Sequence, residues 1–319
     1  MFLKNLFSPL KLAAAIDLGG TNTTLALVDQ QGKLHHRSIF STKDFAAPVD
    51  FVNSMSGAIE KAIRELGDYN PRLQGIGVGA PNSHARLRVL EQPVNLPWSG
   101  VVPLAAMFED RMQCRASLIN DAQAAALGEL HFGDGRLMDD FLFVTLGTGI
   151  GSAMIANGQL IQGQAGFAGE LGHVIMEQNG RACNCGRKGC LETYVAANGL
   201  VATYKQLRDT DTLEANHALN AEGVFQAART GDKHAIAAFN STGEMLGRAL
   251  ANSVAISNPA AIFLFGGLTQ AGDFLWRPVR QAFEKNLMSI YRSHVQIRPS
   301  GVPSKEAALL GAASLIFND

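Results

Sequence analysis

Short runs of hydrophobic residues bounded by glycines predict most of the strands of this chain. Residues 141–146 form one such run, and strand character resumes over residues 152–156 before Asn157-Gly158, a dipeptide typical of hairpin turns. Residues 14–18 form a second run, which leads through a Gly-Gly-Thr turn at residues 19–21 into another apolar stretch. Each segment therefore predicts a strand, a glycine-rich turn and a second strand.

Helical spacing of apolar residues predicts the remaining elements. Residues 45–66 place Phe51, Met55 and Ile59 on one face, as an amphipathic helix does. Further helices are predicted at residues 103–113, 222–229, 234–257, 276–288 and 305–316, an alanine-rich helix after Asn120, and further strands at residues 73–79, 116–119, 261–265 and 295–298. This mixture of strands and helices is typical of the α/β class.

The two strand–turn–strand segments resemble each other. Gly19 of the first matches Gly147 of the second, which suggests duplicated domains with a nucleotide phosphate chain between the two turns. A dinucleotide fingerprint would be followed by a helix, whereas a strand follows here, so we interpret the turns as hairpin tips whose N–H groups bind an anion. The alternative is a plain glycine-rich hairpin. Asp17 stands where the second copy has Thr145, which favours a divalent cation beside the phosphates.

Composition and charge narrow the class of protein. At 319 residues with 47% hydrophobic residues, the chain is long enough for two domains. A formal net charge of −1 gives no electrostatic argument for nucleic acid or an anionic membrane, and no apolar stretch approaches the ~20 residues that span a bilayer. Lys4, Pro9 and Lys11 interrupt the first apolar segment, so we interpret residues 1–13 as a short tail rather than a signal peptide. We therefore expect a cytoplasmic protein.

Polar residues at predicted strand ends are the first candidates for a site. Asn82 follows a strand and a tight turn, and Asn95 shares a loop with Trp98, whose indole either packs in the core or lines a pocket. Asn120 and Asp121 lie between a strand and a helix. Asp121 is either a helix N-cap or a general base for a bound hydroxyl, and the two phosphate-type turns favour the base.

Cysteines cluster late in the chain. Cys183, Cys185 and Cys190 lie within eight residues, ten positions after His173. Three thiolates and an imidazole are a complete tetrahedral ligand set for structural zinc, and the alternative is a group of unliganded thiols. The fourth cysteine, Cys114, stands in an apolar context and is expected to be a buried small hydrophobic residue.

These motifs together resemble the ROK family (repressor, open reading frame, kinase), and the similarity runs from about residue 14 to the C-terminus. The segments that carry it are Asp17–Thr21, Gly79–Asn82, Asn120–Ala122, Gly147–Gly151, Glu170–His173 and Cys183–Glu192. The resemblance implies a duplicated actin-like (ribonuclease H-like) fold, with two α/β domains around a central cleft. We expect the domains at residues 1–120 and 121–304, with the C-terminal helix at 305–319 completing the first and the zinc motif in the second.

The resemblance also implies a role for each motif of a sugar kinase. The residue matching Asp121 is the base that deprotonates the acceptor hydroxyl, usually that on C6 of a hexose. Sugar-binding positions are Asn82, Asn95, Asn120, Asp121, Glu170, His173 and Glu192. Positions for ATP and its Mg²⁺ are Asp17, Gly19, Gly20, Thr21, Gly147, Thr148, Gly149, Gly266 and Gly267. His173, Cys183, Cys185 and Cys190 would bind a structural zinc, with His173 facing the metal through one ring nitrogen and the sugar through the other.

The expected reaction is the ATP-dependent phosphorylation of a hexose at C6, with glucose, the substrate of the family's glucokinases, as the preferred acceptor. Alternatives within the family are kinases for fructose, N-acetylmannosamine or N-acetylglucosamine. Residues 83–89 are also more basic than expected near the sugar, which leaves the choice of acceptor open. A non-catalytic sugar sensor is a further alternative, which the intact Asp121 and phosphate turns disfavour.

The resemblance carries three further expectations. Repressors of the family have a helix-turn-helix before the first phosphate turn, and the roughly dozen residues here are too few for one. Dimers are common in the family, so we expect a homodimer. Loss of zinc is expected to weaken sugar binding through a displaced Glu192 more than ATP binding, because the ATP turns would lie elsewhere.

Overall fold

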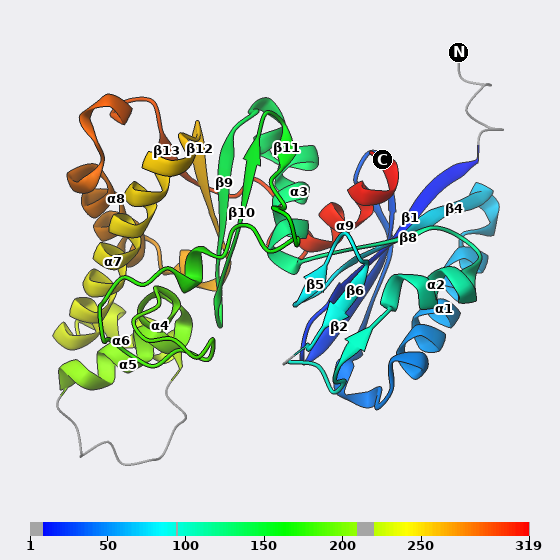
Figure 1. Ribbon diagram of the computed structural model, residues 1–319, viewed down its shortest axis with the longest axis horizontal. Coiled ribbons are helices and arrows are strands. Elements are labelled where there is room, and N and C mark those ends of the chain that lie inside the picture. Colours follow the sequence, from blue (N-terminus) through cyan, green and yellow to red (C-terminus); the bar gives the residue numbers. More distant parts are fainter. Residues whose placement is uncertain (1–8, 94, 209–219, 319) are drawn as a thin grey trace. The chain divides into compact units, whose positions relative to one another are not determined.

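The computed structural model describes residues 9–93, 95–208 and 220–318, which form two compact α/β units (Figure 1). Unit 1 comprises Met1–Leu137, Gln162–Ala168 and Gly301–Asp319, and unit 2 comprises Met138–Ile161 and Gly169–Ser300. Of the predicted N-terminal tail, residues 1–8 lie outside the described part, and the first strand begins at Leu10.

Unit 1 is built on a five-stranded sheet with the order β3-β2-β1-β4-β8. Its strands are β1 (Leu10–Leu18), β2 (Asn22–Asp29), β3 (Leu34–Ser41), β4 (Pro71–Gly79) and β8 (Ala116–Ile119), and its helices are α1 (Pro48–Glu65), α2 (Leu104–Met112), α3 (Asp121–Phe132) and α9 (Ala307–Phe317). A small antiparallel sheet adds β5 (Ser83–His84), β6 (Val89–Glu91) and β7 (Val101–Val102). The first glycine-rich turn joins β1 to β2, as predicted.

The alternating sequence of β4 determines how helices pack on this sheet. Ile76 and Val78 point into a core that also contains side chains of α1 and α2. Gly77, between them, faces α9, and a Cβ at this position would lie 1.8 Å from the carbonyl oxygen of Ala312. Glycine is therefore required here because the backbone of α9 lies directly against the strand.

Unit 2 is built on a second five-stranded sheet with the order β11-β10-β9-β12-β13. Its strands are β9 (Phe141–Leu146), β10 (Ile150–Ala156), β11 (Gln159–Leu160), β12 (Ala261–Phe265) and β13 (Gln296–Pro299), and its helices are α4 (Glu192–Val195), α5 (Ala197–Arg208), α6 (Ala221–Arg229), α7 (Lys233–Ser257) and α8 (Asp273–Asn286). Side chains of α7 and α8 share one core with β9 and β12. The second glycine-rich turn joins β9 to β10, and Asn157 and Gly158 form the predicted hairpin with φ angles of 52° and 69°.

The two sheets have the same topology. In each, the first strand pairs antiparallel with the second strand of the sheet and parallel with the fourth, counted in chain order. The hairpin partner is extended by a further antiparallel strand, and the opposite side by a further parallel strand. This agreement in order and direction supports the duplication that the two turns suggested.

The boundary between the units differs from the one predicted. The prediction divided the chain at residues 120 and 121, which falls at the first residue of α3, whereas unit 1 continues to Leu137. The reason is that α3 packs closely on α9: a Cβ at Gly311 would lie 1.6 Å from the carbonyl oxygen of Ala124, and one at Gly128 would lie 2.3 Å from that of Ala307. A strand-to-helix junction in the sequence gave no sign of this pairing.

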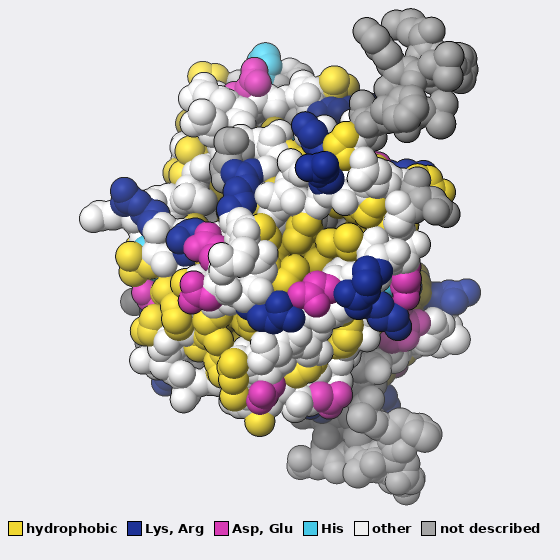
Figure 2. Space-filling view, turned by 90° about the vertical axis from the view of Figure 1, so that its right-hand side faces the viewer, with side chains coloured by type: hydrophobic (Ala, Val, Ile, Leu, Met, Phe, Trp, Pro, Cys, Tyr) yellow, Lys and Arg dark blue, Asp and Glu magenta, His cyan; other side chains and the backbone are white. Residues whose placement is uncertain are grey.

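Several elements were not predicted. β3 is an edge strand that carries the polar residues His35, His36 and Arg37, so its sequence lacks the alternation that predicts a strand. α4 and α5 follow the cysteine motif, and their sequences lack a clear helical spacing of apolar residues. No helix among the described residues is long and apolar enough to cross a membrane. On the face drawn in Figure 2, basic and acidic side chains are interspersed rather than separated into fields of one sign.

Candidate active site

In unit 1, the candidate residues lie at the carboxyl ends of three parallel strands. Asp17 of β1 is in register with Gly79, the last residue of β4, and Gly79 is in register with Ile119, the last residue of β8. Asp121 follows two residues later, and its Cα is 3.8 Å from the position a Cβ on Gly79 would take. The sheet thus brings the two predicted carboxylates to one edge, where open α/β sheets bind ligands.

The helix cap at this edge is Asn120 and not Asp121. The side chain of Asn120 accepts hydrogen bonds from the backbone N–H groups of Ala122 at 2.9 Å and Gln123 at 3.3 Å. Asp121 is the first residue of the helix, and its Oδ1 accepts from the N–H of Ala122 at 2.8 Å. The capping explanation for Asp121 is therefore wrong, because its neighbour has that role.

The environment of both carboxylates disfavours their charged forms. Asp121 remains accessible to solvent, yet the protein atoms around it displace enough water to raise its pKa, against opposing hydrogen bonds from Ala122 and Asn120. Burial and the nearby charge of Asp121 raise the pKa of Asp17 to about 6. Paired carboxylates with raised pKa values are frequent at catalytic and cation-binding sites.

The first glycine-rich turn is stabilised by a backbone hydrogen bond and by the hydroxyl of Thr42, which follows β3. The N–H of Gly19 donates to the carbonyl of Asn22 at 3.1 Å, and Thr42 Oγ1 donates to the carbonyl of Gly19 at 2.7 Å. A Cβ on Gly20 would lie 2.5 Å from the carbonyl oxygen of Asn95. The predicted sugar-binding loop therefore lies directly against the predicted phosphate turn.

Trp98, in the same loop, packs in the core. Its Nε1 donates to the carbonyl of Phe45 at 3.0 Å, and its ring lies 5.2 Å from that of Phe51 between centroids. The packing interpretation of this residue is confirmed. Asn82 stands beyond the end of β4 with a φ of 54°, a left-handed conformation that asparagine tolerates better than most residues.

Gln123 is a candidate that the sequence did not reveal. Its buried side chain donates through Nε2 to the carbonyl of Gly166 at 2.9 Å and to that of Ala168 at 3.3 Å. The first turn of α3 is thus bonded to residues 162–168, the segment that leads to Glu170. An amide in an alanine-rich helix carries no sequence signal for this role.

In unit 2, the second glycine-rich turn lies beside the end of β12. The N–H of Gly147 donates to the carbonyl of Gly149 at 3.0 Å, and Thr148 is exposed at the tip. Gly266 follows β12 with a φ of 106°, and a Cβ there would lie 2.5 Å from the carbonyl oxygen of Leu146. Gly266, Gly267 and the turn are therefore brought together at the carboxyl ends of the two central parallel strands.

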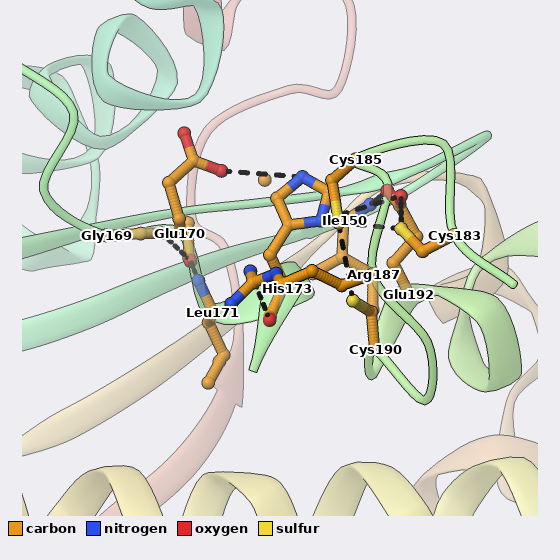
Figure 3. Close-up of polar contacts among 12 residues, drawn as sticks. Ile150, Gly169, Glu170, Leu171, His173, Cys183, Cys185, Arg187, Cys190 and Glu192 are labelled. Carbon is orange, nitrogen blue, oxygen red and sulfur yellow. Dashed lines mark hydrogen bonds and ion pairs between the residues drawn. The ribbon is translucent and has the colours of Figure 1, made fainter. Parts of the chain in front are cut away.

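The four predicted metal ligands form one cluster (Figure 3). The ligand atoms of His173, Cys183, Cys185 and Cys190 all lie within 4.8 Å of one another. Cys185 Sγ is 3.6 Å from Cys190 Sγ, and Cys183 Sγ is 3.7 Å from His173 Nδ1. A tetrahedral zinc with Zn–S bonds of about 2.3 Å needs ligand atoms about 3.8 Å apart, so the four residues fit this metal.

The three thiols of the cluster differ in pKa when no metal is bound. Hydrogen bonds from Arg187 lower the pKa of Cys185 to about 6, whereas burial raises the pKa of Cys183 to about 12 and also raises that of Cys190. Without a metal, two of the three thiols would therefore stay protonated at neutral pH. A zinc ion held by these residues would displace the two protons, because thiolates are its ligands.

His173 and Glu192 connect the metal cluster to the predicted sugar contacts. Nδ1 of His173 faces Cys183, while its Nε2 lies 3.8 Å from Oε2 of Glu170, so the two ring nitrogens face different groups (Figure 3). Glu192 Oε1 lies 4.0 Å from Nδ1 of the same histidine. Glu170, His173 and Glu192 are therefore grouped in unit 2.

The location of Glu192 corrects one expectation. Its Oε2 accepts a hydrogen bond from the N–H of Ile150 at 3.3 Å, directly after the second phosphate-type turn. The zinc motif and Glu192 were expected to lie apart from the ATP turns, but in unit 2 the carboxylate contacts one of these turns. The sequence could not show this, because 42 residues separate the two partners.

Comparison with known proteins agrees with this architecture. The ROK family model matches residues 13–318. A glucokinase from Thermotoga maritima is 33% identical over 94% of this chain and 96% of its own length, and an N-acetylmannosamine kinase from Yersinia pestis is 31% identical over 94% and 96%. The structure of a ROK family glucokinase from Streptomyces griseus in complex with glucose and AMPPNP superimposes with a TM-score of 0.78 at 28% identity, covering 97% of this chain and 100% of the other.

The fold and the sites thus define a duplicated α/β protein with two glycine-rich turns and a Cys₃His cluster. The chain belongs to the ROK family, and its fold is the actin-like two-domain fold of the sugar kinases in that family.

Proposed function

We propose that this protein is an ATP-dependent hexose kinase that phosphorylates the C6 hydroxyl, with glucose as its preferred acceptor. The observation that carries the proposal is Asp121. Its carboxylate lies at the carboxyl end of β8, is not needed as the helix cap, and has a pKa raised toward the range in which a carboxylate accepts a proton. A relative of similar length, from Thermotoga maritima, is a glucokinase.

Asp121 would act on the attacking oxygen alone. Phosphoryl transfer depends mainly on alignment and on neutralising charge at the phosphate oxygens, so the protein needs little covalent chemistry. As the sugar hydroxyl attacks, its proton moves to Asp121, which requires the ionised carboxylate. The Asn120 amide and the N–H of Ala122 hold that carboxylate in place.

The two turns would bind the nucleotide phosphates through backbone N–H groups, and Gly266 and Gly267 would flank the adenosine. Mg²⁺ bound with ATP supplies charge neutralisation, and Asp17 is the carboxylate beside the turn of unit 1 that fits an oxygen-preferring cation. The Cys₃His cluster would hold a structural zinc that fixes the segment carrying Glu192.

The acceptor is expected to be a neutral sugar. The basic residues after Asn82 raised doubt about this, but both arginines have structural partners. Arg88 forms an ion pair with Glu109 at 2.6 Å, and Arg86 Nη1 donates to the carbonyl of Gln164 at 3.0 Å. Arg88 is thus neutralised by Glu109, and Arg86 is bonded to the backbone of unit 1, which accords with an uncharged acceptor such as glucose or the alternative sugars.

The test is an ADP-release assay with ATP and Mg²⁺ over glucose, fructose, mannose, N-acetylmannosamine and N-acetylglucosamine. We expect the highest kcat/KM with glucose, and a loss of about 10²-fold or more for the Asp121→Asn protein. A preference for N-acetylmannosamine, the substrate of the Yersinia pestis relative, would replace the acceptor and keep the chemistry. Binding of glucose without ADP release from any sugar would contradict the kinase and support a sensor.

We further propose a homodimer that works in the cytoplasm, where ATP is available and cysteines remain reduced. All four cysteines are free thiols, which accords with that compartment. Sedimentation at micromolar concentration gives the oligomeric state directly, and a mass of 34.0 kDa would contradict the dimer.

A further inference from the structure

The second phosphate-type turn is bonded at both ends to the segment that follows the metal ligands. At one end, Glu192 Oε2 accepts from the N–H of Ile150 at 3.3 Å. At the other, the N–H of Ala197 donates to the carbonyl of Gly147 at 2.9 Å. The turn is therefore not supported by its own hairpin alone.

Close packing between the turn and Glu192 reinforces this contact. A Cβ on Gly149 would lie 2.8 Å from Glu192 Oε2, so only glycine leaves room for the carboxylate in its present place. Gly149 is thus required by a side chain of the protein in addition to any phosphate that approaches the turn.

The metal cluster sets the position of Glu192. Glu192 Oε1 lies 3.6 Å from Cys183 Sγ, whereas its other oxygen, Oε2, accepts from Ile150 (Figure 3). Cys190 is fully buried two residues before it. Arg181, which lies between the ligands His173 and Cys183, donates to the carbonyl of Thr193 at 2.9 Å and thereby holds the residue after Glu192. A metal that fixed Cys183 and Cys190 would also fix the backbone of the segment that carries Glu192.

We propose that Glu192 is a positioning residue that couples the metal centre to the nucleotide turn, so that nucleotide affinity depends on the bound metal even when no sugar is present. The inference rests on the proposed function, because it requires the turn to bind the phosphates of ATP. It differs from a role in sugar binding alone, in which removal of Glu192 would leave nucleotide binding by the sugar-free protein unchanged.

The experiment measures binding of AMPPNP with Mg²⁺ to sugar-free protein by titration calorimetry. Glu192→Met keeps the length of the side chain and removes the acceptor, and we expect it to weaken AMPPNP binding about tenfold, as the loss of a charge-assisted hydrogen bond does. Glu192→Gln retains an acceptor oxygen and should bind AMPPNP within about threefold of the wild type. Glu170→Gln makes the same charge change at the other carboxylate assigned to the sugar, and should not alter AMPPNP binding.

The second part of the experiment removes zinc, by chelation or by Cys185→Ser, from protein in which Glu192 is unchanged. Elemental analysis should give one zinc per chain for the wild type and for Glu192→Met, and Cys185→Ser should lose the metal. If the metal acts through Glu192, Cys185→Ser and chelated wild type bind AMPPNP as weakly as Glu192→Met. The double variant Cys185→Ser, Glu192→Met should then show no further loss.

The outcomes separate the two proposals. Equal AMPPNP affinity of wild type, Glu192→Met and zinc-free protein would overturn the coupling and leave the kinase intact. A wild type that binds no AMPPNP while it retains zinc would overturn the proposed function, and the coupling with it. Additive losses in the double variant would show that metal and Glu192 act separately, which also overturns the coupling.

Discussion

The two glycine-rich turns share a topology but are stabilised by different parts of the chain. In unit 1, Thr42 Oγ1 donates to the carbonyl of Gly19 and is hydrogen-bonded to Thr23 Oγ1 at 2.9 Å, so a residue of β2 and the residue that follows β3 support the turn. In unit 2, Glu192 and Ala197 support the turn from a segment that follows the metal ligands. The two units therefore share a strand order, but the residues that stabilise the turn differ between them.

The residue before each turn shows the same divergence. Thr145 of unit 2 uses its hydroxyl within the hairpin, where Oγ1 accepts from the N–H of Gly151 at 3.0 Å. Its counterpart in unit 1 is Asp17, whose pKa is raised to about 6 by burial and by the charge of Asp121. Unit 1 therefore places two carboxylates at this edge of its sheet, while unit 2 uses the equivalent position within its hairpin and adds the Cys₃His cluster.

The largest effect is expected from the catalytic carboxylate of unit 1. Asp121→Asn retains hydrogen-bonding capacity and cannot accept the proton, so kcat should fall by about 10²–10⁴-fold while glucose binding changes much less. Steady-state kinetics and direct glucose titration measure the two quantities. A near-normal kcat in this variant would show that Asp121 is not the base. The proposed difference in chemistry between the two units would then be wrong.

The next effect compares the turns by adding one methyl group to each. In Gly20→Ala the new Cβ meets the backbone carbonyl of Asn95, which cannot move away without displacing the loop, whereas in Gly149→Ala it meets the flexible end of the Glu192 side chain. We expect Gly20→Ala to lower unfolding free energy by about 1–3 kcal/mol and to weaken ATP binding strongly. Gly149→Ala should weaken ATP binding with a smaller loss of stability.

The control is Gly147→Ala, because a Cβ at that position has no heavy atom within 4 Å. Urea denaturation and AMPPNP titration of the three variants give the ranking. If Gly149→Ala proved the more destabilising, the turn of unit 2 would be the more rigidly packed one, contrary to the comparison.

Sequence reasoning predicted the elements whose signal is local. The glycine-rich turns, the amphipathic α1 and the hairpin at Asn157 each follow from residues close together in the chain, and the structure has them where predicted. The spacing of His173 and the three cysteines likewise sufficed for a cluster that fits zinc. What it missed depends on distant partners: the packing of α3 on α9 moved the boundary, and the contact of Glu192 with Ile150 joined two motifs treated as separate.

A further effect concerns the free energy that unit 1 loses by keeping the carboxylate of Asp17 charged in the folded protein. Because the pKa of Asp17 is about 6 in the folded protein and 3.8 for an unperturbed aspartate, its charged form is disfavoured by folding. The cost, about 3 kcal/mol, is fully present well above pH 6 and vanishes below the unfolded pKa. In Mg²⁺-free buffer without nucleotide, Asp17→Asn should therefore stabilise the protein at about pH 8, and this gain should shrink toward about pH 4.

The matched control for Asp17 is Asp29, a carboxylate of the same sheet in which both oxygens have polar partners. Its Oδ1 accepts from the N–H groups of Gln31 and Lys33, and its Oδ2 lies 2.7 Å from His35 Nε2. Asp29→Asn should lower the unfolding free energy at the same alkaline pH, opposite in sign to Asp17→Asn. Destabilisation by both variants would show that Asp17 also has a structural role.

The smallest effect tests whether unit 1 influences the segment before Glu170. Gln123→Ala removes the hydrogen bonds to the carbonyls of Gly166 and Ala168, so the unfolding free energy should fall by about 1–2 kcal/mol. If these bonds also fix the segment that leads to Glu170, KM for glucose should rise roughly threefold with kcat little changed. Arg86→Ala, which removes a bond from an exposed side chain to Gln164 of the same segment, is the control and should leave KM unchanged. A lower unfolding free energy with an unchanged KM would restrict Gln123 to a structural role.

A rise in KM would show that the helix carrying Asp121 also positions a sugar contact. The roles of the two units would then be less separate than the comparison of the two turns suggests.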